Sequence, residues 1–346
     1  MTDLFTPVRL GRYALRNRIV MAPMTRDRSP GAVPTELVRT YYAQRATAGL
    51  IVTEGIAPEP MGHGYVDSPG LYTDAQVRAW QRVTDAVHAR GGRIFAQLMH
   101  VGRISHPALL DGRTPVAPST VGGADHVVPL ALEAGEISNI VAGFARAARN
   151  AVRAGFDGVE IHGANGYLPH QFLATNVNLR GDEWRGSIEK RARFLIEVAA
   201  AAAAAIGADR VGVRISPGNG YNDIVEADAA ATYAYLLDRL DALGLAYLHV
   251  YDTRPGFDVA ELVLGHYRGR LILNGGYDKA GAEADLAEGR ADLIAFGTAF
   301  IANPDLPARL ASGAPLAEAD RATFYSSGAR GYTDYPALAG TLAEAA

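Results

Sequence analysis

The amino-acid sequence predicts an α/β fold, a single (β/α)8 TIM barrel over residues 1–346. Two observations favour this fold. Short runs rich in β-branched residues alternate with amphipathic runs, and about eight such units follow one another along the chain. Strands that are apolar on both faces and alternate with helices form parallel sheets with right-handed crossovers. Eight repeats of that unit fit a closed barrel better than an open sheet.

Eight apolar runs are the expected barrel strands. In chain order they cover residues 18–23, 50–55, 93–98, 157–162, 210–216, 246–251, 270–276 and 292–297. Between the second and third, residues 74–92 have the spacing of an amphipathic helix and end at Gly91 and Gly92, a common helix stop. The alanine run from Ala199 is expected to be the close-packing face of another helix.

One segment interrupts this alternation. From Ile104 to Glu133 the chain is rich in Pro and Gly and has no helical periodicity. Long connections without secondary structure are usually lids or binding loops in compact domains. The segment follows the third expected strand, so it leaves from the barrel face that carries catalytic sites. We therefore expect an extended, lid-like loop there.

Composition excludes several classes of function. The net charge of −4 comes from interspersed signs, so neither nucleic acid nor a membrane surface is favoured as a partner. The absence of cysteine removes disulfides, thiolate nucleophiles and cysteine-ligated metal centres, and no metal site is expected. The N-terminus has no signal-peptide pattern, and the most apolar window, residues 194–207, is too short to span a bilayer. A cytoplasmic protein, monomeric or homo-oligomeric, is the expectation.

The residues where the expected strands end are mostly polar or glycine. They are Pro23, Met24, Thr25, Gly55, Gln97, Met99, His162, Asn165, Tyr167, Arg214, Asn274, Gly275, Gly276, Gly297 and Thr298. Any one of them alone is explained as a turn former or a helix cap. Together, at the face of a barrel where βα loops build the site, they predict an active site.

The last two strands end in glycine-rich turns, "NGGYDKAGAEADL" and "AFGTAFIANPDL". Barrels commonly bind phosphate at these two positions, through backbone N–H groups and a helix N-terminus. Tight turns without a ligand remain the alternative. Gln97 and Arg214 supply donors on the opposite side, so the pattern suits a phosphorylated ring cofactor lying across the barrel mouth.

Six motifs in the same order resemble the old yellow enzyme family of flavin-dependent ene-reductases. They are "LRNRIVMAPMTRDRS", "FAQLMHVGRISHP", "FDGVEIHGANGYLPHQFL", "WRGSIEKRARF", "FGTAFIANPDL" and "FYSSGARGYTDYP". The resemblance covers nearly the whole chain. It implies a (β/α)8 barrel holding noncovalent FMN, reduced by NADPH or NADH and reoxidised by an electrophilic alkene such as an α,β-unsaturated carbonyl.

The resemblance also implies roles for the polar strand ends. His162 and Asn165 would donate hydrogen bonds to the substrate carbonyl oxygen, so that the β-carbon accepts hydride from flavin N5. Negative charge then develops on that oxygen, where fixed donors stabilise it most. Tyr167 would protonate the α-carbon from the opposite face.

Further residues would bind the cofactor or line the substrate pocket. By the family pattern Arg214 lies near flavin N1 and O2, Gln97 bonds the pyrimidine edge and Thr25 donates to O4. The expected cofactor contacts are completed by Pro23, Met24, Gly55, His162, Asn274, Gly275, Gly276, Gly297 and Thr298. Tyr325, in the C-terminal motif, would line the substrate pocket.

The sequence departs from the family pattern at two positions. Thr298 replaces an arginine that usually meets the FMN phosphate, and a hydroxyl cannot supply the charge-assisted contact of a guanidinium. Lys279 is a possible distant contributor. Met99 stands where many relatives have tryptophan, which predicts a wider and more pliable pocket.

Two other classes of function remain open from the residues. One is a flavin-free barrel lyase or hydrolase. The only lysines, Lys190 and Lys279, do not end strands, and the sequence contains no His-x-His or His-Glu-x-x-His. The other is a catalytically silent flavin-binding protein, which would not need Tyr167. The expected partner of an enzyme is a small electrophilic alkene.

Overall fold

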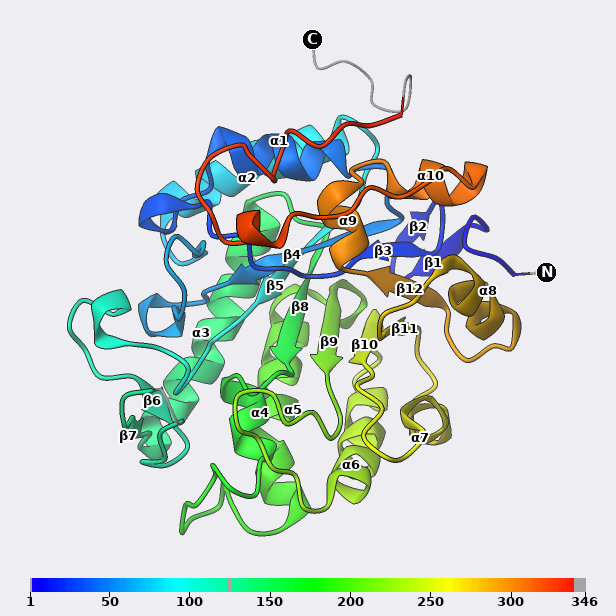
Figure 1. The fold of residues 1–346 in the computed structure, drawn as a ribbon. Coiled ribbons are helices and arrows are strands. Elements are labelled where there is room, and N and C mark those ends of the chain that lie inside the picture. Colours follow the sequence, from blue (N-terminus) through cyan, green and yellow to red (C-terminus); the bar gives the residue numbers. More distant parts are fainter. Residues whose placement is uncertain (1, 124–125, 339–346) are drawn as a thin grey trace.

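The computed structural model describes residues 2–123 and 126–338. Eight parallel strands close into a barrel (Figure 1). In chain order they are β3 (Ile19–Met21), β4 (Leu50–Ile56), β5 (Ile94–Leu98), β8 (Gly158–Gly163), β9 (Val211–Ile215), β10 (Tyr247–Tyr251), β11 (Leu271–Asn274) and β12 (Leu293–Phe296). Each lies within or overlaps one of the eight expected runs, and the prediction of a (β/α)8 barrel is confirmed.

Helices cover the outside of the barrel (Figure 1). They are α1 (Glu36–Gln44), α2 (Asp74–His88), α3 (Ala134–Arg153), α5 (Ile188–Ile206), α6 (Ala229–Asp241), α7 (Val259–His266), α8 (Lys279–Ala287) and α10 (Leu306–Ser312), with short helices α4 (Leu168–Leu173) and α9 (Thr298–Ala302) at strand ends. The expected helix within residues 74–92 is α2, which begins at a capping box of Thr73 and Gln76. Ala199 and Ala202 of α5 are fully buried, as the alanine run predicts.

A hairpin that the sequence analysis did not identify closes the N-terminal end of the barrel. Strands β1 (Val8–Leu10) and β2 (Tyr13–Leu15) pair antiparallel. Their buried side chains join a core cluster with Phe95 and Tyr247, which come from the barrel strands β5 and β10. The barrel interior is therefore filled at this end, and the catalytic face of such a barrel is the one at the C-terminal ends of its strands.

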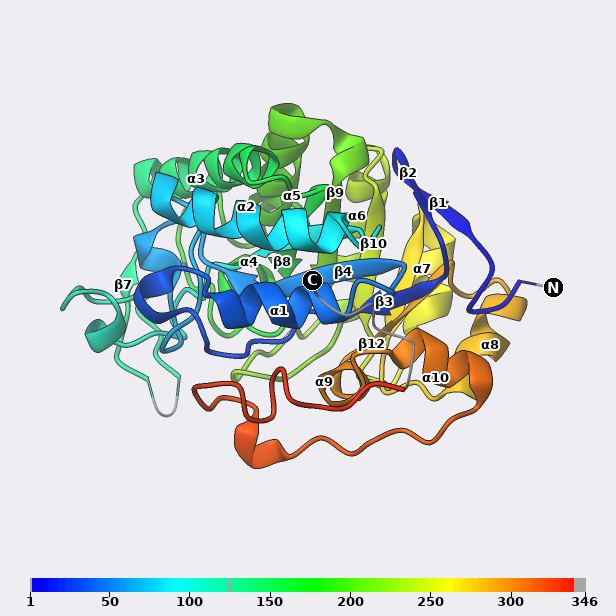
Figure 2. The ribbon, with the colours of Figure 1, turned by 90° about the horizontal axis from the view of Figure 1, so that it is seen from above.

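The C-terminal segment, residues 323–331, borders that catalytic face. Its backbone is held by two buried arginines: Arg26 donates to the carbonyl oxygens of Phe324 and Gly331 at 3.1 and 2.8 Å, and Arg28 donates to that of Thr323 at 2.9 Å. Figure 2 shows this segment, in red, beside α1 and α9. A motif distant in sequence is thus fixed against the loop after β3.

The described residues of the segment 104–133 contain little regular structure, as expected. It holds one short turn of helix, η3 (Pro107–Leu109), and two short strands, β6 (Val116–Ala117) and β7 (Leu130–Ala131), which pair parallel. Arg103 donates to the carbonyl oxygen of Gly122 at 3.0 Å. Among the helices of the described residues, none is both long and apolar enough to cross a bilayer.

Gly212 tests the packing inside the barrel, and Gly265 on the outer helix α7 provides a control. A Cβ on Gly212 would lie 2.3 Å from the Tyr247 ring, whereas a Cβ on Gly265 of α7 would meet nothing within 4 Å. Overpacking a barrel interior costs roughly 1–3 kcal/mol, so Gly212→Ala should lower the melting temperature. Gly265→Ala, the control, should be neutral or stabilise by about 0.4–1 kcal/mol. Thermal unfolding of both variants measures the difference, and equal melting temperatures would contradict this packing.

Candidate active site

A cavity of about 810 Å³ opens at the C-terminal end of the barrel strands. Its size is in the range of cofactor and ligand pockets. It brings together most of the residues that the sequence predicts for the site, namely Pro23, Met24, Thr25, Asn165, Tyr167, Arg214, Asn274, Gly276, Gly297, Thr298 and Tyr325. Arg214 and Asn274 lie on β9 and β11, Tyr325 lies on the C-terminal segment, and the others lie just after β3, β8, β11 and β12.

Five predicted residues lie beside or beneath the cavity and do not line it. Gln97 and His162 are buried. Met99 packs against Gly55, where a Cβ would lie 2.4 Å from the Met99 methyl carbon. Gly275 lies against the backbone of the loop after β10. Because Met99 is part of the wall behind Tyr167, the expected wider pocket stays a prediction. No described residue of 104–133 lines the cavity, so the lid stays a prediction too.

The cavity also holds residues that the sequence analysis missed. Tyr65, from the loop after β4, and Asn219 and Tyr221, from the loop after β9, all line it. The signal for the last two was their position a few residues beyond Arg214, in a loop at the catalytic face of the barrel. Tyr65 follows its strand by nine residues and belongs to no motif, so nothing in the sequence singled it out.

Arg214 is a buried cation with free donors. Its Nη2 donates to Asn274 Oδ1 at 3.0 Å, while its Nε and Nη1 have no partner among the described residues. Burial lowers the pKa of Arg214, but a guanidinium keeps its charge in proteins. Buried N–H donors without partners are costly, so they point to an anionic or strongly accepting group in the cavity.

A carboxylate beneath the cavity balances this charge. Glu160 accepts a hydrogen bond from Gln97 Nε2 at 2.8 Å and lies 2.9 Å from His249 Nδ1. Burial raises the pKa of Glu160, but His249, Arg214 and Gln97 together outweigh it and leave that pKa below its usual range. Gln97 is thus held from below by an ionised carboxylate, which orients its amide.

His162 is a neutral imidazole. Burial, and next the positive charge of Arg214, hold its pKa well below the usual range. Its neighbour across the sheet register is Arg214 itself, and its ring centroid lies 4.9 Å from that of Tyr167. Its Nδ1 is buried and has no partner among the described residues. A neutral ring keeps one donor and one acceptor, so His162 can donate without carrying charge.

Tyr167 is a phenol that stays protonated. Burial raises its pKa well above the usual value, and burial also raises the pKa of Tyr65 to about 12. The two hydroxyl oxygens are 2.6 Å apart. This short hydrogen bond holds the Tyr167 hydroxyl in one place, and both groups remain acids at neutral pH.

The opposite side of the cavity is lined by glycine turns. Gly276 has φ +78°, a conformation that glycine adopts without strain, and Gly297 precedes α9. Of the described lining residues only Arg26 and Arg214 carry a cationic side chain, and Arg26 already bonds carbonyl oxygens. Lys279 lies outside the cavity lining, 3.9 Å from Glu283. Backbone N–H groups and the Thr298 hydroxyl are left to hold a phosphate.

These features fit FMN. The two unpartnered N–H groups of Arg214 suit the electron-rich edge of a flavin ring, and the turns at Gly276 and Gly297 suit its phosphate. Within the described residues no group of three or more His, Cys, Asp or Glu side chains is placed to hold a metal ion.

Comparison with known proteins identifies the family. The model of the NADH:flavin oxidoreductase / NADH oxidase family matches residues 3–317. The chain is 43% identical to putative 12-oxophytodienoate reductase 4 of Oryza sativa subsp. japonica, over 97% of this chain and 93% of that protein. It is 45% identical to chanoclavine-I aldehyde reductase of Penicillium roqueforti (strain FM164), over 97% and 96%. The structure of morphinone reductase in complex with tetrahydroNAD has a TM-score of 0.96 at 46% identity and covers 98% and 99%.

The chain belongs to the NADH:flavin oxidoreductase / NADH oxidase family. The resemblance to old yellow enzymes is confirmed. So are the predictions of FMN with NAD(P)H as reductant and of ene-reductase chemistry. The family assignment excludes the flavin-free lyase or hydrolase.

The phosphate end of the cavity yields a testable prediction. An arginine at position 298 would add a charge-assisted contact that contributes about 1.5–3 kcal/mol, so Thr298→Arg should tighten FMN binding by roughly 10 to 100-fold. Fluorescence titration of the apoprotein with FMN measures it. Ser312→Arg, on the exposed end of α10, adds the same charge away from the cavity and is the control. Unchanged or weaker affinity in Thr298→Arg would show that the phosphate site is already electrostatically complete.

Proposed function

We propose that this chain reduces the C=C bond of α,β-unsaturated carbonyl compounds in the cavity at the barrel mouth. His162 and Asn165 hold the carbonyl oxygen, and Tyr167 delivers a proton. The observation that carries the proposal is the Tyr167 hydroxyl, protonated and fixed by Tyr65, in the cavity lined by Asn165 and Arg214. The names of three relatives, 12-oxophytodienoate, chanoclavine-I aldehyde and morphinone reductases, each refer to a carbonyl compound.

His162 and Asn165 donate hydrogen bonds to the carbonyl oxygen, where negative charge develops. As the β-carbon is reduced, negative charge moves to the carbonyl oxygen. Fixed donors that meet this charge contribute about 3 kcal/mol each in comparable oxyanion sites. His162 is neutral because of burial and Arg214, so it donates a hydrogen bond without being a strong acid that would release its proton.

Tyr167 completes the reduction. FMN, when bound, supplies the hydride that it has received from NAD(P)H. Tyr167 gives its proton to the α-carbon, and Tyr65, at 2.6 Å, stabilises the phenolate that is left by donating its own hydroxyl. The raised pKa of both phenols keeps them protonated through neutral pH, so Tyr167 has its proton to give there.

Several features of the proposal remain predictions from the sequence, although some of the residues involved line the cavity. We propose residues 1–346 as one FMN-binding domain. Met99 and Tyr325 stay predicted substrate contacts, and Pro23, Met24, Thr25, Gly55, Gln97 and the glycines stay predicted flavin contacts. A cytoplasmic location, the absence of a nucleic-acid partner and a monomeric or homo-oligomeric state also stay predictions. Membership in a family of NAD(P)H-dependent oxidoreductases disfavours a catalytically silent flavin-binding protein, and reoxidation of the reduced wild-type protein by an enone tests the difference directly.

Tyr167→Phe should slow the reoxidation of the NADPH-reduced protein by cyclohexenone roughly 10² to 10⁴-fold, because a positioned acid contributes about this much. Reduction by NADPH should be nearly unchanged, which makes it the internal control. Stopped-flow absorbance separates the two half-reactions. Tyr65→Phe removes only the partner hydroxyl and should give a smaller effect in the same half-reaction. If reoxidation of Tyr167→Phe keeps the wild-type rate, solvent supplies the proton and Tyr167 has no acid role.

Phenols test the donor pair, since phenolates resemble the enolate that forms on the substrate. Phenols typically give such flavoproteins a long-wavelength charge-transfer band. In His162→Ala combined with Asn165→Gly this band should be absent on titration with p-hydroxybenzaldehyde. Glycine is used at position 165 because the backbone there has φ +56°, which alanine adopts only with strain. A band of full intensity and affinity in the double variant would remove both residues from the site.

A further inference from the structure

The amide of Asn165 has two ends, and only one can serve the proposed reaction. Its Nδ2 donates hydrogen bonds and its Oδ1 accepts them. A substrate carbonyl oxygen needs the donor. An amide side chain rotates between two orientations of nearly equal shape, and the hydrogen-bond network decides between them. The hydrogen bonds around Asn165 determine which of the two orientations its amide takes in this protein.

The backbone of Asn165 is fixed first. Asn165 and Gly166 have φ of +56° and +76°, a left-handed turn after β8. The Asn165 N–H donates to Ser216 Oγ at 3.0 Å, and the Asn165 carbonyl oxygen accepts from Asn222 Nδ2 at 2.8 Å. The Gly166 N–H donates to His170 Nδ1 at 2.9 Å. The turn after β8 is therefore tied to the turn after β9 and to helix α4.

The side chain of Asn165 is fixed next, by Asn219. The backbone N–H of Tyr221 donates to Asn219 Oδ1 at 3.0 Å, the local turn that Asn side chains commonly make with the residue two positions on. Because Oδ1 is engaged there, Asn219 turns its Nδ2 to Asn165 and donates to Asn165 Oδ1 at 2.9 Å. Asn165 Oδ1 is thus occupied, and its Nδ2 is left to donate. A single backbone N–H sets the direction of two amides in series.

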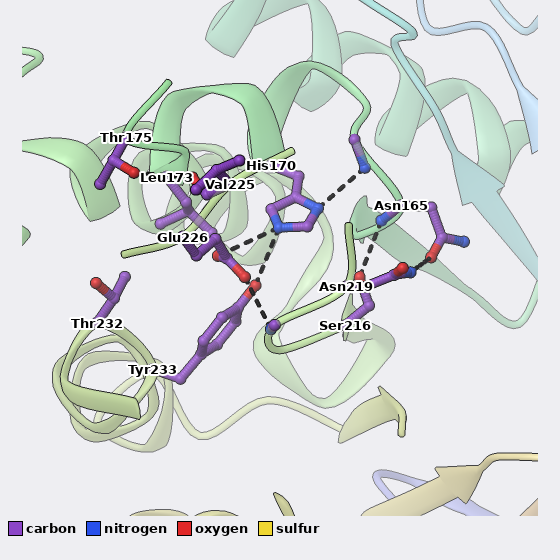
Figure 3. Close-up of polar contacts among 12 residues, drawn as sticks. Asn165, His170, Leu173, Thr175, Ser216, Asn219, Val225, Glu226, Thr232 and Tyr233 are labelled. Atoms are coloured by element: carbon purple, nitrogen blue, oxygen red, sulfur yellow. Dashed lines mark hydrogen bonds and ion pairs between the residues drawn. The ribbon is translucent and has the colours of Figure 1, made fainter. Parts of the chain in front are cut away.

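A buried contact between a neutral His170 and Glu226 links the two turns (Figure 3). His170 accepts at Nδ1 from Gly166, so its proton is on Nε2, which lies 3.2 Å from Glu226 Oε1. The other carboxylate oxygen, Glu226 Oε2, accepts from the N–H of Gly218 at 2.8 Å. Gly218 precedes Asn219 in the chain. The pair therefore contacts the turn of Asn165 on one side and the turn of Asn219 on the other.

We propose that Asn219 is a positioning residue, which keeps Asn165 Nδ2 available to the substrate carbonyl. This inference rests on the function proposed above. If Asn165 turned over, Oδ1 would face the carbonyl oxygen, and two acceptors would meet where a donor is needed. Asn219 excludes that orientation because its own oxygen is held by the Tyr221 N–H. The fixed orientation of the Asn165 amide favours ligands that place a hydrogen-bond acceptor next to Asn165 Nδ2.

Asn219→Asp tests the direction of the amide. An aspartate keeps the turn with the Tyr221 N–H, but its second oxygen also accepts, so Asn165 must turn its Nδ2 toward position 219. Binding of p-hydroxybenzaldehyde, followed by its charge-transfer band, should weaken at least tenfold. Asn219→Leu, of similar size and uncharged, leaves Asn165 free to turn and should weaken binding only about twofold. FMN content of both variants should match the wild type, and both should unfold cooperatively.

Repeating the Asn219→Asp substitution in the Asn165→Gly variant separates a positioning role of Asn219 from effects of the added charge or of misfolding. In Asn165→Gly there is no amide to turn, so adding Asn219→Asp should weaken phenol binding at least threefold less than it does in the wild type. The same pattern should appear with cyclohexenone as a higher KM in the oxidative half-reaction. Equal losses in both backgrounds, or wild-type phenol affinity in Asn219→Asp, would overturn the proposal.

Failure of the proposed function and failure of the positioning role give different results. If the wild-type protein gives no phenol band and no enone-dependent reoxidation, the function fails. If the wild type gives both and Asn219→Asp behaves like it, the function stands and only the positioning role of Asn219 fails.

Discussion

Pairing between the first and last strands of the barrel is the constraint on which the site depends. β3 and β12 join in parallel, with Ile19 opposite Ile294 and Met21 opposite Phe296. This contact closes the sheet, so all eight strands end at the same rim. It places the loop of Pro23 to Thr25 beside Gly297 and Thr298, from opposite ends of the chain. The hairpin of β1 and β2 fills the other end, and the cavity of about 810 Å³ opens where the strands' carboxyl ends meet.

The electrostatics of the site follow from burial in this barrel. Arg214 brings a positive charge under the cavity, and Glu160 with His249 lies beneath to balance it. That same charge, together with burial, keeps His162 neutral, while burial keeps Tyr167 protonated. A fixed cation, a neutral donor and a neutral acid are thus available without any group having to change its charge before the reaction. Such preorganised polar groups stabilise charge that develops in a transition state more than mobile water does.

The periodicity of the sequence made the barrel and the face that carries its site predictable. The eight strand runs alternate with helices and are buried on both faces, so barrel and site face followed directly. The hairpin of residues 8–15 was missed because two three-residue strands carry too little pattern. A strand-end position also does not say whether a side chain reaches the cavity: Gln97 points to Glu160 and Met99 packs on Gly55. Tyr65 and Asn219 act through contacts with residues distant in sequence, which no local pattern contains.

We expect this cavity to pass reducing equivalents from a nicotinamide cofactor through FMN to an activated alkene. One anaerobic absorbance experiment on the purified protein tests it most directly. We expect flavin bands near those of free FMN, bleached by NADPH or NADH and restored by one equivalent of cyclohexenone per flavin. A protein with no flavin bands after incubation with FMN, or a reduced flavin that stays bleached when the enone is added, would contradict the account.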